Sequence, residues 1–262
     1  MSGLAQAIRA ALLTGKPRQK VMSARRVARD WRIGRLAWRF DAAVPDRPAW
    51  PQDLRLLPPA RMPKRGRAGS HRNRVALWHS LAHIEFVAID LALDMAGRFG
   101  ERMGEAFVTD FLSVAADEAM HFALLERKLV SLGTHYGALP AHDGLWEAAG
   151  ETRHDVAARL AIVPMVLEAR GLDVTPAMLE RVRLAGDANG ARILARILDD
   201  EIRHVAIGAR HFRDTCVSRD EAPRETWQKL VSMHFRGALK PPFNDSARST
   251  AGLSRDWYAA VA

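Results

Sequence analysis

The sequence predicts an all-α protein built around an antiparallel four-helix bundle. From about residue 72 onward, apolar residues recur with the period of an α-helix, and no strand-like alternation reaches a useful length. Four long helical stretches are expected in this part, at about 72–98, 102–132, 152–170 and 188–215. A short connection after the first stretch and a longer one, 134–151, after the second suit an antiparallel bundle with one crossover.

The ends of these helices are expected at residues that stop helical backbone. Gly100, Gly133 and Gly171 each follow a long apolar-periodic stretch, where glycine commonly ends a helix. Pro176 suits the first turn of a further short helix. A helix at about 222–236 is then expected to lead into an irregular, proline-containing tail.

The N-terminal part differs in composition from the rest. Residues 1–40 look helical, whereas residues 44–63 contain six prolines, which exclude a regular helix or a central strand. We therefore expect two parts: a basic, proline-rich extension over 1–71 that packs on the body, and the helical bundle with a C-terminal helix and tail over 72–262.

Composition excludes several classes of protein. The chain has 262 residues, of which 48% are hydrophobic and 26% charged, as in folded globular proteins. The single cysteine, Cys216, rules out a disulfide framework and a cysteine-rich metal site, and is interpreted as a buried thiol. The sequence contains no run of 18 uncharged apolar residues, so we expect no membrane span. The N-terminus also lacks the apolar core of a signal peptide. We therefore expect a cytoplasmic protein.

The formal net charge of +9 is concentrated at the N-terminus. Residues 1–74 contain 18 Lys or Arg against 4 Asp or Glu, whereas residues 75–262 contain 21 against 26. Such a basic arm could contact RNA, an acidic partner or a membrane surface. The alternative is a solvated arginine-rich extension that packs locally and binds nothing.

Acidic side chains interrupt the apolar stripe of every long helix. Each stripe carries one glutamate, and two stripes add a histidine one turn later. These six residues are Glu85, Glu118, His121, Glu168, Glu201 and His204. Unpaired carboxylates in an apolar interior cost several kcal/mol and repel one another, and no Lys or Arg occupies the stripes. Four carboxylates and two imidazoles are a ligand set for two transition-metal ions in a bundle core.

The spacing of these residues repeats. The two glutamates of each half lie 33 residues apart, and each position of the first half recurs 83 residues later in the second. Two helical hairpins related by a pseudo-twofold axis would bring such ligands to a shared centre. An aspartate precedes each Glu-x-x-His motif, Asp117 in the first half and Asp200 in the second. Either could accept the outer N–H of a ligand histidine.

Taken together, these motifs resemble the ferritin-like di-iron carboxylate superfamily. Glu168 followed by Asp200-Glu201-Ile-Arg-His204 matches its pattern, whereas the first half has Met120 where arginine is common. Flanking words such as HIEFVAIDLALD, ADEAMHFALLERKL and LKPPFNDSARSTAGL resemble one uncharacterised family more closely. That family is known only as a ferritin-like domain of unknown function. The similarity extends from about residue 72 to the C-terminus.

The resemblance implies a role for each ligand. Glu85 and Glu168 would each bind mainly one metal, and the two histidines would each cap one metal. The glutamates of the Glu-x-x-His motifs would bridge the pair, with the two preceding aspartates as supports. The implied cofactor is two iron ions, although manganese or a mixed Mn/Fe pair suits the same ligands.

Three functions follow from the resemblance. The first is a dioxygen-activating oxidoreductase, a monooxygenase or hydroxylase of an unidentified small molecule, with an unknown electron donor. The second is a di-iron hydroxylase acting on tRNA, because Glu168-Ala-Arg170 loosely resembles that enzyme and the arm is basic. The third is an iron-binding or peroxide-scavenging protein of the ferritin or rubrerythrin kind, without a specific organic substrate.

Two further residues near the stripes have open roles, and two histidines are expected to be structural. Pro164, one turn before Glu168, should kink its helix or simply precede its end. Gly208, on the stripe beyond His204, either leaves room for a channel or permits close helix packing. His79 and His83 fall off the face of Glu85 and are expected to be structural.

Overall fold

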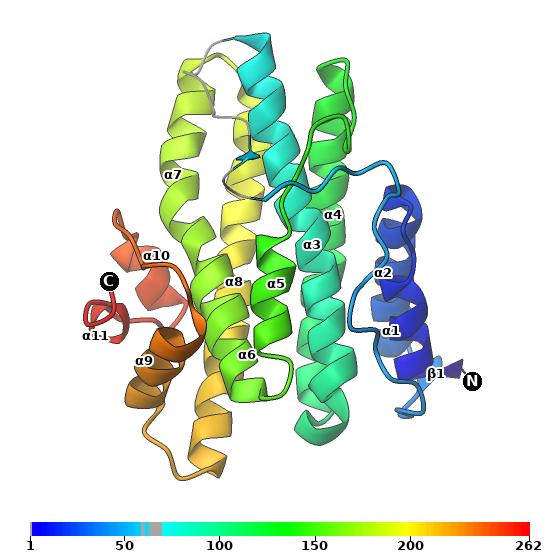
Figure 1. Ribbon diagram of the computed structural model, residues 1–262, viewed down its shortest axis with the longest axis vertical. Helices are drawn as coiled ribbons and strands as arrows, with labels where there is room; N and C mark the ends of the chain where they lie inside the picture. The colour runs from blue at the N-terminus through cyan, green and yellow to red at the C-terminus, as the bar shows by residue number, and fades with distance from the viewer. Residues whose placement is uncertain (1, 59–60, 63–69) are drawn as a thin grey trace. The chain divides into compact units, whose positions relative to one another are not determined.

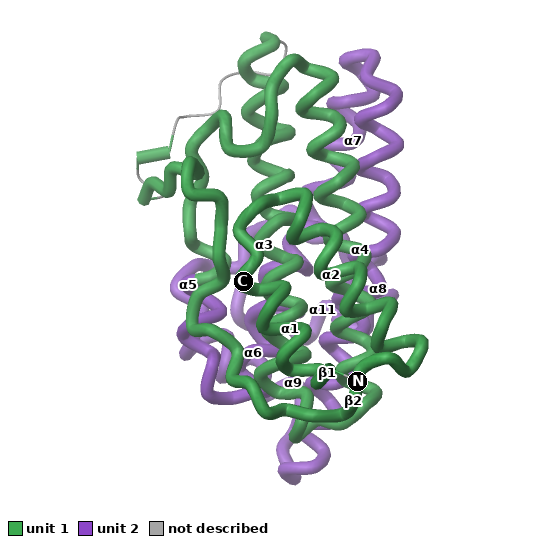
Figure 2. Tube along the Cα trace, turned by 90° about the vertical axis from the view of Figure 1, so that its right-hand side faces the viewer, with its two compact units in different colours: residues 1–146 green, residues 147–262 purple. Residues whose placement is uncertain are grey.

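The structure of the chain is a computed structural model that describes residues 2–58, 61–62 and 70–262 (Figure 1). The prediction of a predominantly helical protein is confirmed. The chain divides into two compact units, Met1–Trp146 and Glu147–Ala262, shown in different colours in Figure 2. The division falls within helix α5 (Gly144–Glu151), so the boundary expected after residue 71 lies inside the first unit. Each unit contains one of the two expected hairpins, and the four-helix bundle stays a prediction.

The first unit is centred on the hairpin of its two longest helices. Its elements are β1 (Ser2–Gly3), α1 (Leu4–Leu12), α2 (Pro17–Arg32), β2 (Leu36–Ala37), α3 (His71–Met103) and α4 (Glu105–Ser131). The strands β1 and β2 form a short parallel pair. Gly104 alone joins α3 to α4 and has a φ of +89°, a conformation that side chains with a Cβ rarely adopt. This tight reversal brings the two long helices together.

Helix α3 does not end near Gly100, contrary to the prediction, and continues to Met103. Glycine serves close packing at this position, because a Cβ would lie 3.1 Å from the ring of Phe40 and would collide with Val108. The helix begins where Ser70 accepts a hydrogen bond from the Asn73 N–H. Helix α3 ends just before Gly104, whose positive φ departs from helical backbone.

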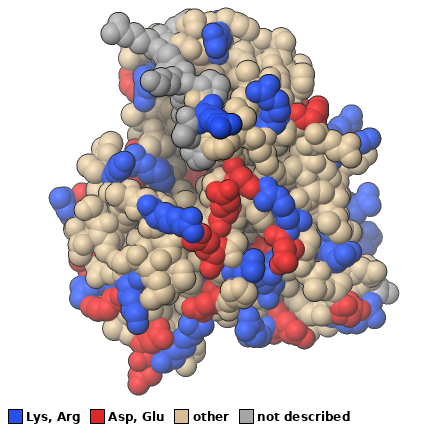
Figure 3. Space-filling view, viewed as in Figure 1, with Lys and Arg blue, Asp and Glu red and all other residues tan. Residues whose placement is uncertain are grey.

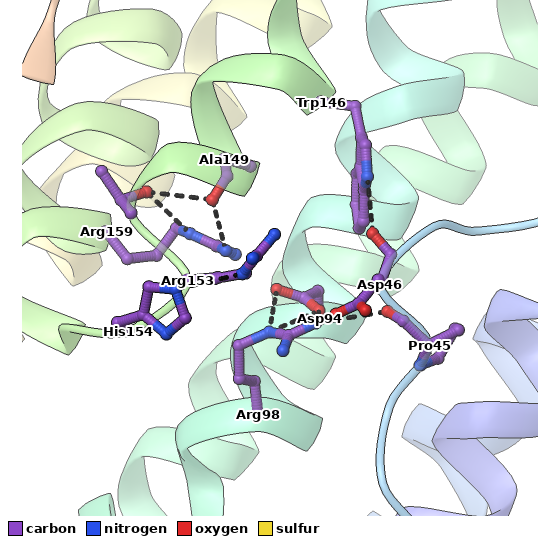
Figure 4. A network of polar contacts seen from close by, with 10 residues as sticks. Pro45, Asp46, Asp94, Arg98, Trp146, Ala149, Arg153, His154 and Arg159 are labelled. Carbon is purple, nitrogen blue, oxygen red and sulfur yellow. Dashed lines mark hydrogen bonds and ion pairs between the residues drawn. The ribbon is translucent and has the colours of Figure 1, made fainter.

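Residues 1–40, which were expected to look helical, contain the two helices α1 and α2, and β2 follows within the same range. Helices α1 and α2 pack against α3 and α4. The described part of the proline-containing segment after β2, residues 38–58, contains no helix, and two of its backbone carbonyls accept side-chain hydrogen bonds from other parts of the unit. Pro59 and Pro63 of the segment expected over 44–63 lie outside the described residues. Arg98 of α3 donates to the Pro45 carbonyl at 3.2 Å, and Trp146 donates to that of Asp46 at 3.1 Å (Figure 4). The described part of this segment therefore contacts α3 of the first hairpin.

A buried ion pair fixes α2 to α3. Lys20 and Asp90 are both fully buried, with Nζ and Oδ1 2.5 Å apart. The Trp50 indole N–H donates to the other oxygen of Asp90 at 2.9 Å. Burial lowers the pKa of Lys20, an effect that the Asp90 charge opposes, and burial raises the pKa of Asp90 to about 6. The pair thus joins the N-terminal extension to the hairpin at a point where a lone charge would be costly.

The second unit holds the other hairpin and the C-terminal helices. Its elements are α6 (Val156–Ile162), the π-helix η2 (Val163–Glu168), α7 (Ala169–Leu184), α8 (Ala188–Ser218), α9 (Pro223–His234), α10 (Asp245–Thr250) and α11 (Arg255–Tyr258). Asp155 and Asp187 cap α6 and α8 through their side chains. The buried Arg159 donates to the Ala149 carbonyl at 2.6 Å, which ties α6 to the segment before it (Figure 4).

The third long helix is not terminated at Gly171, and Pro176 does not start a new one. Both lie inside α7, so these two predictions were wrong. Proline lacks the N–H that would bond the carbonyl four residues earlier, that of Leu172. The Asn244 amide supplies that hydrogen bond at 3.1 Å, and the Asn244 backbone N–H donates to Asp173 at 3.0 Å. A residue of the C-terminal tail therefore provides the hydrogen bond that the Leu172 carbonyl would otherwise lack because of Pro176.

The expected irregularity at Pro164 takes the form of the π-helix η2. Proline cannot make the ordinary i to i−4 hydrogen bond, and a wider π turn accommodates its ring. Gly208 of α8 faces this proline, since a Cβ on Gly208 would lie less than 3.0 Å from the Pro164 ring. Close helix packing is thus what Gly208 permits.

One helix in the described residues, α3, is long and apolar enough to cross a membrane by length and composition. Of its most apolar window, 67% is buried inside the structure, as in the core helix of a soluble protein. Basic and acidic side chains are interspersed on the face drawn in Figure 3. The cytoplasmic location stays a prediction.

Candidate metal centre

The first unit brings three of the six expected ligands together. Glu85 comes from α3, and Glu118 and His121 come from α4, where their spacing of three places them on one face. All three are buried, with at most 4% of the residue exposed. The Nδ1 atom of His121 lies 3.3 Å from Oε2 of Glu85 and 3.2 Å from Oε2 of Glu118. Each residue offers a ligand atom within 4.8 Å of the others.

Burial and mutual repulsion determine the charge of this cluster. Burial raises the pKa of Glu85 to about 8, and the neighbouring Glu118 carboxylate adds to the effect. Burial opposes a charge on His121, but hydrogen bonds to Glu118 and Glu85 outweigh it and raise the pKa of His121 to about 12. Without a metal ion, Glu85 is therefore protonated at neutral pH, and the charge of His121 balances that of Glu118. A metal ion at this position would replace these protons. Oxygen and imidazole donors of this kind suit iron and manganese, so the residues could hold a metal ion.

The second unit positions its three expected ligands on the corresponding elements. Glu168 ends the π-helix η2, and Glu201 and His204 lie on α8. Glu201 and His204 are buried, and Glu168 is partly exposed. His204 Nδ1 and Glu201 Oε2 are 3.8 Å apart, so this pair repeats the association of Glu118 with His121. A Cβ on Gly171 would lie 3.9 Å from Cγ of Glu201, which places α7 directly beside that carboxylate.

The two aspartates that precede the Glu-x-x-His motifs lie in different surroundings. Asp200 is mostly buried and accepts from Arg196 at 2.7 Å, with Arg203 3.5 Å away, so both cations come from its own helix. Asp117 is partly exposed and borders a groove between α2 and α4. Their role as supports of ligand histidines stays a prediction.

The histidines that lie off the stripe are buried in a network of their own. His83 Nδ1 is 2.9 Å from the Tyr136 hydroxyl and its Nε2 is 2.9 Å from the His142 carbonyl. His79 Nε2 accepts the backbone N–H of Gly137 at 2.9 Å. Burial lowers the pKa of both His79 and His83 to about 4, so both are neutral at physiological pH. These contacts hold the connection after α4 against α3, which fits the structural role expected.

Sequence reasoning missed the buried Lys20–Asp90 pair. Both residues interrupt apolar stretches, Lys20 beside Val21 and Ala24, and Asp90 within Ile89–Leu93. One apolar helix face carries a lysine and another carries an aspartate, and these opposite charges could have predicted the pair. Cys216 is a buried free cysteine, as expected, although it lies within α8 and not after it.

Comparison with known proteins identifies a family. Residues 13–259 match the model of the family described as "Protein of unknown function (DUF455)". The chain belongs to this family. A protein of Haemophilus influenzae (strain ATCC 51907 / DSM 11121 / KW20 / Rd), described as "Uncharacterized protein", is 41% identical over 222 residues. The alignment covers 81% of this chain and 77% of that protein. No solved structure matches the chain.

The family match extends further toward the N-terminus than the similarity expected from the sequence. It includes α2 and the proline-containing segment as well as both hairpins. The family thus comprises both units, and its description assigns no activity. The function of the chain has to be inferred from its own residues.

Proposed function

We propose that the two hairpins form a ferritin-like four-helix bundle that binds two metal ions, preferably iron. The proposed ligands are Glu85, Glu118, His121, Glu168, Glu201 and His204. Glu85 and Glu168 would each bind mainly one ion, and Glu118 and Glu201 would bridge the two. His121 and His204 would each cap one ion.

One observation carries this proposal: the buried association of Glu85, Glu118 and His121 in the first unit. Two carboxyl groups this close in an apolar interior need a proton or a metal ion between them, and a metal ion would replace the protons that Glu85 and His121 otherwise hold. Because the same residue types recur 83 positions later on matching elements, the second half is expected to provide an equivalent set. Two equivalent halves make a dinuclear centre the simplest arrangement.

We infer that the reaction is the oxidation of a small molecule with dioxygen. A reduced di-iron pair, when bound, supplies the electrons that activate dioxygen. The chain would contribute the rest: buried apolar neighbours would exclude water, and the carboxylates and histidines would hold the ions. Asp117 and Asp200 would orient the ligand histidines by accepting their outer N–H. Glu168 is the proposed ligand that lies at the end of a π turn, so its backbone differs from a regular α-helix.

The ligand set is tested by alanine substitution with matched controls. Glu118→Ala and Glu201→Ala should each lose most of the bound metal and retain their helix content by circular dichroism. The exposed Glu101 and Glu180, one in each unit, provide control substitutions that should retain the metal. Metal per chain is measured by mass spectrometry after identical reconstitution.

The pattern of loss distinguishes a shared centre from two separate sites. If the halves share a dinuclear centre, either substitution removes both ions because each glutamate bridges the pair. If each half binds its own ion, each substitution removes only one. Full metal content in Glu118→Ala would overturn the proposal altogether.

A further inference from the structure

A groove of about 860 Å³ runs between α2 and α4 in the first unit. Its α2 wall carries four exposed arginines, Arg25, Arg26, Arg29 and Arg32. Its α4 wall carries short side chains, among them Thr109, Ser113 and Ala116. Long cationic side chains opposite short neutral ones leave an open channel with positive charge along one side.

The groove has a net positive charge, because four arginines and two aspartates line it. Arg29 pairs with Asp30, which also borders the groove, at 2.9 Å. Among the residues that the structure describes, Arg25, Arg26 and Arg32 have no acidic partner. Asp117 is the one acidic side chain on the α4 wall. Arg25, Arg29 and Arg32 are spaced by four and three residues along α2, which is about 6 Å and about 4.5 Å along the helix axis.

One aromatic side chain, Trp31, borders the groove, and a second, Trp38, lies beside it. Trp31 borders it and is fixed by a hydrogen bond from its indole N–H to Thr109 Oγ1 at 2.9 Å. Trp38 is 39% exposed and lies beside Trp31, with ring centroids 5.9 Å apart. Arginines along a groove with exposed aromatic rings are the combination that binds single-stranded nucleic acids, because cations contact phosphates while the rings stack on bases.

We propose that this groove binds single-stranded RNA, with Arg25, Arg26 and Arg32 contacting phosphates and Trp38 stacking on an unpaired base. An anionic membrane fits less well. Binding to a bilayer requires an apolar helix face, and that face of α2, with Val21, Ala24 and Val27, is buried inside the unit. The proposal is independent of the metal centre, because no metal ligand borders the groove.

The test compares two double variants of the full-length protein. Arg25→Ala/Arg32→Ala removes two cations of the groove, and Arg183→Ala/Arg192→Ala removes two exposed arginines of the second unit. Binding to a fluorescein-labelled single-stranded RNA of about 15 nucleotides is followed by fluorescence anisotropy between 50 and 200 mM salt, concentrations over which phosphate contacts weaken steeply. Two other probes are tested separately: vesicles rich in phosphatidylserine, and inorganic phosphate.

The groove variant should bind RNA about tenfold more weakly at the lower salt concentration, with a log–log salt slope shallower by about 1.4. The control variant should bind like the unmodified protein, and Trp38→Ala should weaken binding without changing the slope. Equal losses in both double variants would mean non-specific attraction and would overturn the proposal. So would affinity for vesicles or inorganic phosphate alone, or RNA binding that salt does not weaken.

Discussion

Replacement of Gly208 by alanine probes the contact that sets the π-helix next to α8. A methyl group at this position would lie less than 3.0 Å from the Pro164 ring, a separation that real Cβ atoms essentially never show. Overpacking of a buried contact costs about 1–3 kcal/mol, and the higher helix propensity of alanine offsets about 1 kcal/mol of it. We therefore expect Gly208→Ala to lower the free energy of unfolding by about 0–2 kcal/mol.

Gly171→Ala is the matched control in the same unit. There the added methyl group would meet Cγ of Glu201 at 3.9 Å, an ordinary van der Waals contact, within the helix α7. Only the gain in helix propensity remains, so this variant should be more stable by about 0.5–1 kcal/mol. Urea denaturation followed by circular dichroism measures both. Equal stabilisation by the two substitutions would refute the close approach of Gly208 to Pro164.

Two further predictions concern buried ionisable groups of the first unit. Lys20→Met leaves Asp90 buried with Trp50 as its remaining partner and should lower the free energy of unfolding by about 3–5 kcal/mol at pH 8, measured by urea denaturation. The double variant Lys20→Met/Asp90→Leu should recover most of that loss. No recovery would mean that the two residues are not coupled. Because the pKa of His83 falls from 6.5 to about 4 on folding, the unfolded chain binds its proton first as the pH decreases. Up to about 3 kcal/mol of stability should therefore be lost between pH 6.5 and 4. In thermal melts, His83→Gln should reduce the loss of stability between pH 6.5 and 4. If the stability of this variant depends on pH as that of the unmodified protein does, His83 is not the cause.

The helical class and the burial of polar stripe residues such as Glu118 and His121 could be predicted from the sequence because they depend on periodicity. Apolar stripes identify helix faces, and a carboxylate such as Glu118 on a stripe is conspicuous for its desolvation cost. Helix ends were predicted less well. Gly100 and Gly171 resemble stop signals, but each lies inside a helix, and a Cβ on Gly100 would collide with neighbouring side chains.

The course of α7 depends on residues far away in the sequence. Pro176 is tolerated because Asn244, 68 positions later, bonds the carbonyl that proline leaves without an N–H. The buried ion pair between Lys20 and Asp90 likewise joins segments 70 positions apart. Local sequence patterns contain no information about such pairings, so only the folded structure reveals them.

Metal analysis of the aerobically purified protein tests the proposed dinuclear centre most directly. The protein should contain about two irons per chain, as expected for four carboxylates and two histidines in a bundle core. Its visible absorption should bleach on anaerobic reduction and return when dioxygen is admitted. A protein that contains no iron or manganese, even after reconstitution with both, would contradict the assignment of Glu85, Glu118 and His121 as metal ligands.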